Sequence, residues 1–265
     1  MFGNLFRNMT PVVKNLLILN GLMFLLAYAF GKDAYGGLML NKTLGLYIFE
    51  SPNFKPYQLI THMFMHGNLM HIFFNMFALV MFGSPLEKVW GSQRFLIFYL
   101  VSGLGAAFIQ QGVSTWHVHK VMAEMGAYNV DWDLVKQAAA LQIPDQISEI
   151  EALLNQAANQ SGAGFRAIEQ VFFQYKTPVV GASGAVFGIL LGFGMLFPNT
   201  ELIMLFFPIP IKAKYFVIIY GLLELFSGIS NRPGDNIAHF AHVGGMIFGF
   251  ILIKIWQKKD RANFY

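Results

Sequence analysis

The feature that most limits how this chain can fold is a series of six apolar blocks, each close in length to what a helix needs to cross a bilayer. The blocks cover residues 13–30, 68–83, 95–111, 181–197, 215–229 and 236–256. Apolar residues make up 55% of the 265 residues and charged residues 12%, which leaves too little polar surface for a water-soluble domain. The sequence therefore predicts an all-α polytopic membrane protein, a six-helix bundle embedded in the lipid bilayer.

The distribution of charge predicts how these spans are oriented. Six spans put both termini on one side, and that side is rich in basic residues, namely Arg7, Lys14, Lys88, Arg94, Lys212, Lys214, Lys254, Lys258, Lys259 and Arg261. The acids there are Glu87, Glu201 and Asp260. The positive-inside rule then makes both termini cytoplasmic, and we expect an integral protein of a bacterial inner membrane.

Two other interpretations of the charge and of the first block are set aside. The net charge of +4 does not indicate nucleic-acid binding, because the basic residues lie between apolar blocks and form no patch with aromatic residues. Ala27-Tyr28-Ala29 mimics a signal-peptidase site, but the apolar run before it is longer than most signal sequences. We expect a retained membrane anchor.

One shift in composition divides the chain into three parts. Residues 1–111 hold spans one to three and a first external loop, and residues 178–265 hold spans four to six and a cytoplasmic tail. Between them, residues 112–177 are polar and carry seven acids against four basic residues, which predicts an external insertion.

The insertion is expected to be mostly helical. Its pattern predicts amphipathic helices over 133–141 and 145–159, separated at Ile143-Pro144, with Ile147, Ile150 and Leu154 on one face of the second. None of its residues completes a catalytic group. We therefore expect it to affect substrate access rather than bond cleavage.

Polar side chains inside the spans point to the functional site, because they are costly at membrane depth. They are His71 and Asn75 in the second span, Ser183 in the fourth, Glu224 in the fifth, and His239 and His242 in the sixth. Spans two, four and six all enter from outside, and His71, Asn75, Ser183 and His242 lie near their outer ends. We expect these four residues to share one layer; Glu224 has no predicted role.

The spacing of small residues predicts which helices touch. Gly184 and Gly188 share one face of the fourth span, as Gly245 and Gly249 do on the sixth, and such pairs let helices approach closely in lipid. This contact would bring Ser183 towards His242.

From Ser183 to Phe197 a helix covers only about 22 Å of a hydrocarbon core near 30 Å, so a helix that begins near Ser183 requires irregular backbone over 178–181 beside a water-filled cavity. A serine near a histidine, with unpaired backbone N–H groups at a helix start and an amide close by, is a set of groups suited to acyl transfer.

The combined motifs resemble those of the rhomboid intramembrane serine proteases. The matching stretches are HGNLMHIFFN (66–75), GSPLEKVWGS (83–92), GASGAVFG (181–188) and AHVGGMIFG (241–249), so the resemblance extends over all six spans. It implies that Ser183 is the nucleophile and His242 the base of a Ser-His dyad, with His71, Asn75 and the Ser183 amide lining an oxyanion hole. It also implies transmembrane protein substrates, cleaved within or near a membrane helix, and no cofactor or metal.

Three positions refine this expectation. Tyr57-Gln58 stands where many rhomboids carry Trp-Arg in the first external loop, and Phe187 is expected to pack on the catalytic imidazole. The nearest acid along the sixth span, Asp235, lies two turns from His242. We therefore expect ring packing, and not a carboxylate, to orient the imidazole.

Two alternatives stay open. One is a non-catalytic rhomboid-like protein that binds transmembrane helices. The other is a haem- or metal-binding membrane protein that uses histidines spaced three or four apart, namely His62, His66, His71, His239 and His242.

Overall fold

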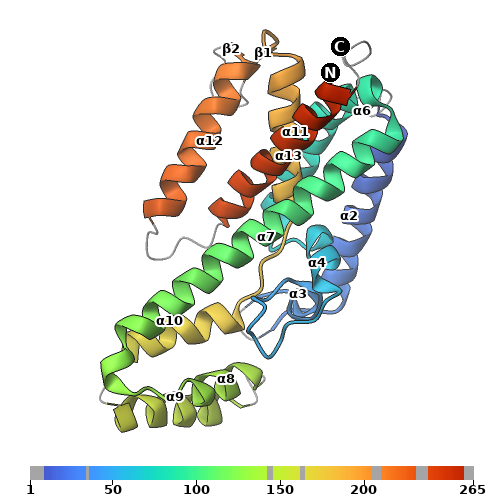
Figure 1. The fold of residues 1–265 in the computed structure, drawn as a ribbon. Coiled ribbons are helices and arrows are strands. Elements are labelled where there is room, and N and C mark those ends of the chain that lie inside the picture. Colours follow the sequence, from blue (N-terminus) through green and yellow to red (C-terminus); the bar gives the residue numbers. More distant parts are fainter. Residues whose placement is uncertain are drawn as a thin grey trace. The chain divides into compact units, whose positions relative to one another are not determined.

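The computed structural model describes residues 9–33, 36–141, 146–161, 165–203, 210–230 and 238–259. Nearly all regular structure in these ranges is helical (Figure 1). The exception is a short antiparallel pair, β1 (Glu201–Leu202) and β2 (Ile211–Lys212). The chain forms two compact units: unit 1 comprises residues 1–23, 68–110 and 181–265, and unit 2 comprises residues 24–67 and 111–180.

Five stretches of helix are long and apolar enough to cross a membrane. They are α2 (Pro11–Ala29), the stretch Leu69–Trp90, α7 (Ser92–Glu124), α12 (Ala213–Ser230) and α13 (His239–Lys259). Leu69–Trp90 consists of α5 (Leu69–Ala78), the π-helical turn η2 (Leu79–Gly83) and α6 (Ser84–Trp90). The sixth apolar helix, α11 (Ser183–Leu196), is shorter, as predicted. The all-α polytopic membrane class is therefore confirmed, and the count of six spans stays a prediction.

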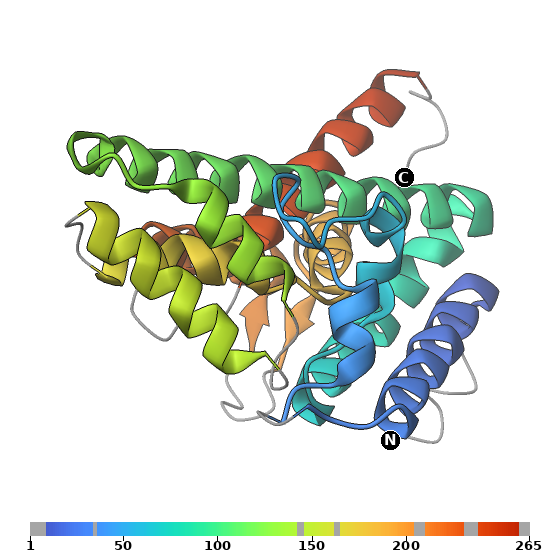
Figure 2. The same cartoon turned by 90° about the horizontal axis from the view of Figure 1, so that it is seen from below.

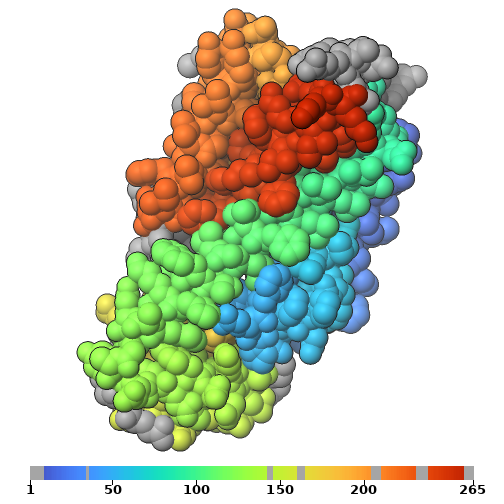
Figure 3. Space-filling view, viewed as in Figure 1, coloured from blue at the N-terminus to red at the C-terminus, as the bar shows by residue number. Residues whose placement is uncertain are grey.

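The outer surface of α12 fits contact with lipid. α12 and α13 reach the surface on the face seen in Figure 3, in orange and red. Five large apolar side chains of α12 are between 53% and 62% exposed, namely Ile218, Ile219, Leu222, Leu223 and Phe226. Such a row of exposed apolar groups is unfavourable in water and favourable against acyl chains.

The second and third helical stretches run past the ends predicted for their spans. The second continues beyond Gly83 through α6 to Trp90, where Gly91, with φ of 77°, stops the helix. The third continues beyond residue 111 to Glu124, into the segment assigned to the insertion. Residues 112–124 contain no proline, so the backbone hydrogen-bond ladder continues although the apolar pattern has ended.

Glu87 fixes the start of α2 within unit 1. Its carboxylate accepts hydrogen bonds from the backbone N–H of Val12 at 3.0 Å and of Val13 at 2.9 Å, and from the hydroxyls of Thr10 and Ser92. The first N–H groups of a helix have no partner inside the helix, so a buried acceptor here stabilises α2. The acid counted above as a cytoplasmic charge is thus a buried helix cap, 3% exposed.

Unit 2 has its own apolar core. The helices α8 (Trp132–Ala140), α9 (Ile147–Ser161) and α10 (Phe165–Lys176) lie side by side, as Figure 2 shows in yellow-green to yellow. Of the three residues predicted to share one face, Ile150 and Leu154 are buried in this core, and Ile147, the first residue of α9, is 42% exposed. Ile143, Pro144 and Asp145 lie outside the described residues. The sequence did not predict α10.

The loop between the first and second predicted spans belongs to unit 2 together with the insertion, and not with the membrane spans to which it was assigned. Leu46 and Val179 form an antiparallel bridge with N–H to O distances of 2.9 and 2.8 Å. The Ser51 hydroxyl donates to the carbonyl of Tyr175 at 2.6 Å. The loop's backbone groups are therefore paired by residues distant in sequence, and composition alone could not indicate this.

Gln58 anchors this loop from a buried position. Its side-chain Oε1 accepts from the backbone N–H of Lys55 at 3.0 Å, and its Nε2 donates to the carbonyls of Thr43 at 3.2 Å and Asn53 at 3.1 Å. The loop, which includes α3 (Met39–Leu44), α4 (Gln58–Thr61) and η1 (His62–Phe64), is thus held by the side-chain amide of Gln58.

Candidate active site

Ser183 is the first residue of α11, directly after a stretch of irregular backbone. Gly181, with φ of 134°, makes the turn that leads into the helix. A methyl group at Gly181 would lie 2.8 Å from Nε2 of His71, so glycine is required both for the backbone angle and for space. At the start of a helix, the N–H groups of the first turn point away from the helix and can bind an oxyanion.

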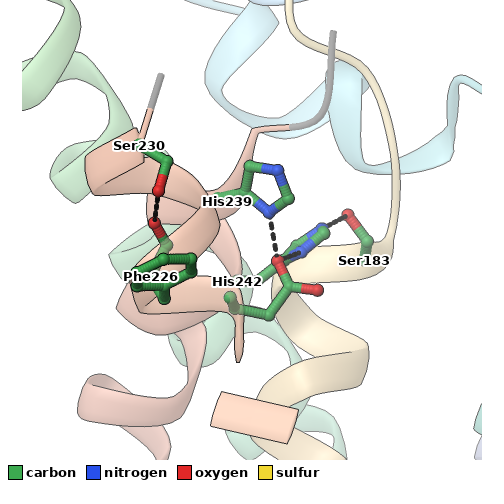
Figure 4. A network of polar contacts seen from close by, with 6 residues as sticks. Ser183, Phe226, Ser230, His239 and His242 are labelled. Atoms are coloured by element: carbon green, nitrogen blue, oxygen red, sulfur yellow. Dashed lines mark hydrogen bonds and ion pairs between the residues drawn. The ribbon is translucent and has the colours of Figure 1, made fainter. Parts of the chain in front are cut away.

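His242 approaches Ser183 from the first turn of α13. Its Nε2 lies 2.9 Å from Oγ of Ser183, and the residue is 8% exposed (Figure 4). The two helices are in close contact through glycines: a Cβ at Gly245 would collide with the carbonyl of Gly184, and one at Gly249 would lie 3.3 Å from Cα of Gly188. The small-residue faces singled out in the sequence therefore form the α11–α13 contact.

The imidazole of His242 is oriented from two directions. The ring of Phe187, one turn after Ser183, stacks on it with centroids 4.1 Å apart and an interplanar angle of 8°. On the other edge of the ring, Nδ1 lies 2.8 Å from Oε2 of Glu224 in α12. The expectation that no carboxylate orients this imidazole is wrong, because the acid comes from a neighbouring helix. Asp235 lies outside the described residues.

Glu224, His242 and Ser183 thus form a continuous hydrogen-bonded chain. With the carboxylate accepting from Nδ1–H of His242, the lone pair of Nε2 is available to accept the Ser183 hydroxyl proton. The sequence did hold a signal for this contact, since an acid within an apolar span requires a partner. It did not indicate which partner. In the structure Glu224 is 7% exposed.

His71 and Asn75 lie on α5, beside this chain. The point where a Gly181 Cβ would lie is 2.8 Å from Nε2 of His71 and 3.5 Å from Oγ of Ser183, so both side chains flank one position. Asn75 is 5% exposed, and its Nδ2 donates to the carbonyl of His71 at 3.0 Å. An amide nitrogen carries two hydrogens, so one donor of Asn75 is committed to the helix.

The histidines considered as metal or haem ligands do not form one cluster. His62 lies in unit 2, where its Nδ1 is 2.7 Å from the carbonyl of Gln58, and His66 is buried in the same unit. Burial lowers the pKa of His62 from 6.5 to about 4, so this imidazole is neutral at pH 7. Among the described residues, one group of side chains has the composition and proximity to hold a metal ion: Glu224, His239 and His242.

Comparison with known proteins agrees with the motifs. A model of the rhomboid domain matches residues 53–127 and 158–259. An uncharacterized mitochondrial rhomboid protein of Schizosaccharomyces pombe is 27% identical over 76% of this chain, and the mitochondrial RHOMBOID-like protein 12 of Arabidopsis thaliana is 28% identical over 96%. The chain spans 52% and 60% of the length of these two relatives.

A rhomboid protease of Salmonella choleraesuis, GlpG, is 38% identical over 61 residues, which are 23% of this chain and 22% of that protein. The relatives that cover 76% and 96% of this chain are both named as mitochondrial proteins. These two matches therefore do not support the expectation of a bacterial inner membrane. The family model covers more than half of the chain and includes the segments that carry Ser183 and His242. The chain belongs to the rhomboid family.

Proposed function

We propose that this protein is an intramembrane serine endopeptidase that cleaves transmembrane substrate proteins within or near a membrane helix. The observation that carries the proposal is the 2.9 Å contact between Oγ of Ser183 and Nε2 of His242, with the far side of the imidazole on Glu224. A non-catalytic member of the family has no need for an activated serine.

In the proposed reaction, Nε2 of His242 takes the hydroxyl proton while Oγ of Ser183 bonds to the carbonyl carbon of the scissile peptide. The carbonyl oxygen becomes an oxyanion. When the C–N bond breaks, the leaving amine takes the proton from Nε2. Water then attacks the acyl-enzyme by the same route in reverse, and Ser183 is restored.

The carboxylate of Glu224 has a positioning role in this scheme. It accepts from Nδ1–H of His242 and so keeps the lone pair of Nε2 towards Ser183; once Nε2 carries the second proton, the carboxylate stabilises the imidazolium. Phe187 limits rotation of the ring by stacking.

The oxyanion is proposed to bind the backbone N–H of Ser183 together with side-chain donors of His71 and Asn75. The position that His71 and Ser183 flank supports this assignment, because a reacting carbonyl needs room beside both the nucleophile and its donors. Hydrolysis also needs water at the start of α11, so we propose that a water-filled cavity lies there and is open to the exterior.

Unit 2 and the orientation of the chain complete the proposal. We propose that both termini lie on the cytoplasmic side, and the excess of basic residues in the connections on that side supports this orientation. The insertion is assigned to substrate access: replacing residues 112–177 with a short linker should slow cleavage of a membrane-embedded substrate more than reaction with a small serine-directed probe. Complete loss of probe labelling in a folded deletion variant would contradict this assignment.

Reaction with a fluorophosphonate probe tests the proposed function. The phosphorus atom bonds to an activated serine oxygen as fluoride leaves, so wild-type protein should be labelled and Ser183→Ala should not. Ser230→Ala is a matched control, because the Ser230 hydroxyl only donates to the carbonyl of Phe226 (Figure 4). Equal labelling of wild type and Ser183→Ala would reject the proposal, and so would an unlabelled but folded wild-type protein.

A further inference from the structure

The proposed mechanism gives no role to His239, the first residue of α13, although its side chain contacts the carboxylate of Glu224. Its Nδ1 lies 2.6 Å from Oε2 of Glu224, the same oxygen that His242 contacts at 2.8 Å (Figure 4). The cleavage reaction needs one imidazole on this carboxylate, and a second imidazole competes for the same oxygen. His239 therefore requires another explanation.

We propose that Glu224, His239 and His242 form a binding site for Zn²⁺, and that the bound ion switches off the catalytic histidine. The ligand atoms of the three side chains all lie within 4.8 Å of one another. Binding of the ion stands apart from the function proposed above, whereas inhibition rests on it.

The donor set matches the known preferences of zinc. Two imidazole nitrogens and one carboxylate oxygen, with a fourth position left to water, are an established zinc environment. With bonds of about 2.0–2.2 Å in tetrahedral geometry, neighbouring ligand atoms lie roughly 3.3 Å apart. The contacts of 2.6 and 2.8 Å therefore need to open by only about 0.5–0.7 Å for the ion to replace the two Nδ1 protons.

The site is held in place before any ion arrives. His239 and His242 are three residues apart on α13, and Glu224 lies on α12, which packs against α13. The stacked ring of Phe187 restricts His242 further. The side chains of Glu224, His239 and His242 are 9%, 11% and 10% exposed, so the group is well buried without being sealed.

Zinc at Nδ1 of His242 changes the tautomer of the imidazole. In the ion-free site the proton is on Nδ1, and Nε2 accepts from Ser183. A zinc ion needs the lone pair of Nδ1, so the proton of the neutral ring moves to Nε2, where it points at Oγ of Ser183. Nε2 can then no longer accept the hydroxyl proton, and the serine is not activated.

The binding test uses the full chain with Ser183→Ala, so that it does not depend on proteolysis. Isothermal titration with Zn²⁺ should give one ion per chain, and X-ray absorption of the bound ion should show two imidazole nitrogens and a carboxylate oxygen. Adding His239→Gln to the Ser183→Ala protein should weaken its affinity for zinc. The loss should exceed the roughly 10- to 100-fold that is typical when a residue that only hydrogen-bonds to a metal ligand is replaced. His119→Gln, a histidine paired with Glu50 in unit 2, should leave it unchanged.

The inhibition test uses wild-type protein and single His239→Gln, each compared with its own zinc-free rate. Zinc should inhibit wild type reversibly, with activity restored by a chelator, and His239→Gln should need at least about tenfold more zinc for half-inhibition. Absence of binding to Ser183→Ala would overturn the site, whether or not the protein is a protease. Zinc binding of unchanged affinity after His239→Gln would also overturn the site. A zinc-loaded wild type that cleaves at its full rate would overturn the inhibition.

Discussion

Replacing Glu224 by Gln removes the negative charge beside His242 and keeps the size of the side chain. In the structure, Oε2 of Glu224 lies 2.8 Å from Nδ1 of His242 and the residue is 7% exposed, so solvent compensates little for the lost charge. A hydrogen bond to a charged group contributes about 1.5–3 kcal/mol net, which corresponds to roughly 10- to 150-fold in rate. If the amide instead presents its N–H₂ group and forces the wrong tautomer, the loss approaches about 10⁴-fold.

The assay is steady-state cleavage of a membrane-embedded substrate by protein reconstituted in liposomes. Glu224→Gln should lower kcat and leave KM nearly unchanged, because the carboxylate acts on the imidazolium that forms during the reaction. Glu201→Gln, which removes an exposed acid from β1, is the matched control and should retain wild-type rates. A folded Glu224→Gln variant with wild-type kcat would refute the positioning role and leave Phe187 alone to orient the ring.

Three further predictions concern the oxyanion donors, the helix contact and unit 2. Asn75→Ala should lower the rate of proteolysis by about 10²- to 10³-fold, while residual labelling by the probe persists. An unchanged rate of proteolysis in the folded double variant His71→Ala, Asn75→Ala would reject both residues as oxyanion donors. Gly245→Ala should destabilise the fold by about 1–3 kcal/mol in thermal unfolding, because the added methyl group meets the Gly184 carbonyl. Gly21→Ala is the control and should not destabilise, because the added methyl group meets no neighbouring atom within 4 Å. Equal melting temperatures of the two variants would contradict the helix contact. Burial lowers the pKa of His62 from 6.5 to about 4, so as the pH falls the unfolded chain takes up this proton at a higher pH than the folded chain does. The free energy of unfolding should therefore decrease by up to roughly 3 kcal/mol as the pH is lowered from 6.5 to 4. His62→Gln should lose that part of the pH dependence, and an identical dependence in the variant would show that His62 is not its source.

The sequence predicts the parts of this molecule that follow from local pattern. Apolar blocks indicate the spans, and the spacing of Gly184 and Gly188 against Gly245 and Gly249 predicts the contact that brings His242 within 2.9 Å of Ser183. The sequence links a helix start near Ser183 to irregular backbone before it, and α11 does begin at Ser183 after such a stretch.

Other features depend on partners that no local pattern names. The third helix runs to Glu124 because nothing in residues 112–124 breaks it, although the apolar pattern stops at 111. The first loop joins the insertion through pairs such as Leu46 with Val179, which are far apart in the chain. Likewise, the acid that contacts His242 is Glu224 on another helix, and a search along the sixth span alone cannot find it.

Cleavage of a defined set of single-span membrane proteins tests the central claim most directly. Wild-type protein and Ser183→Ala are each reconstituted with these substrates in liposomes, and the products are identified by mass spectrometry. The account predicts that wild type cuts at least one substrate within or next to its membrane helix and that Ser183→Ala, equally folded, cuts none. Identical products from both proteins, or intact substrates with wild-type protein that reacts with the fluorophosphonate probe, would contradict it.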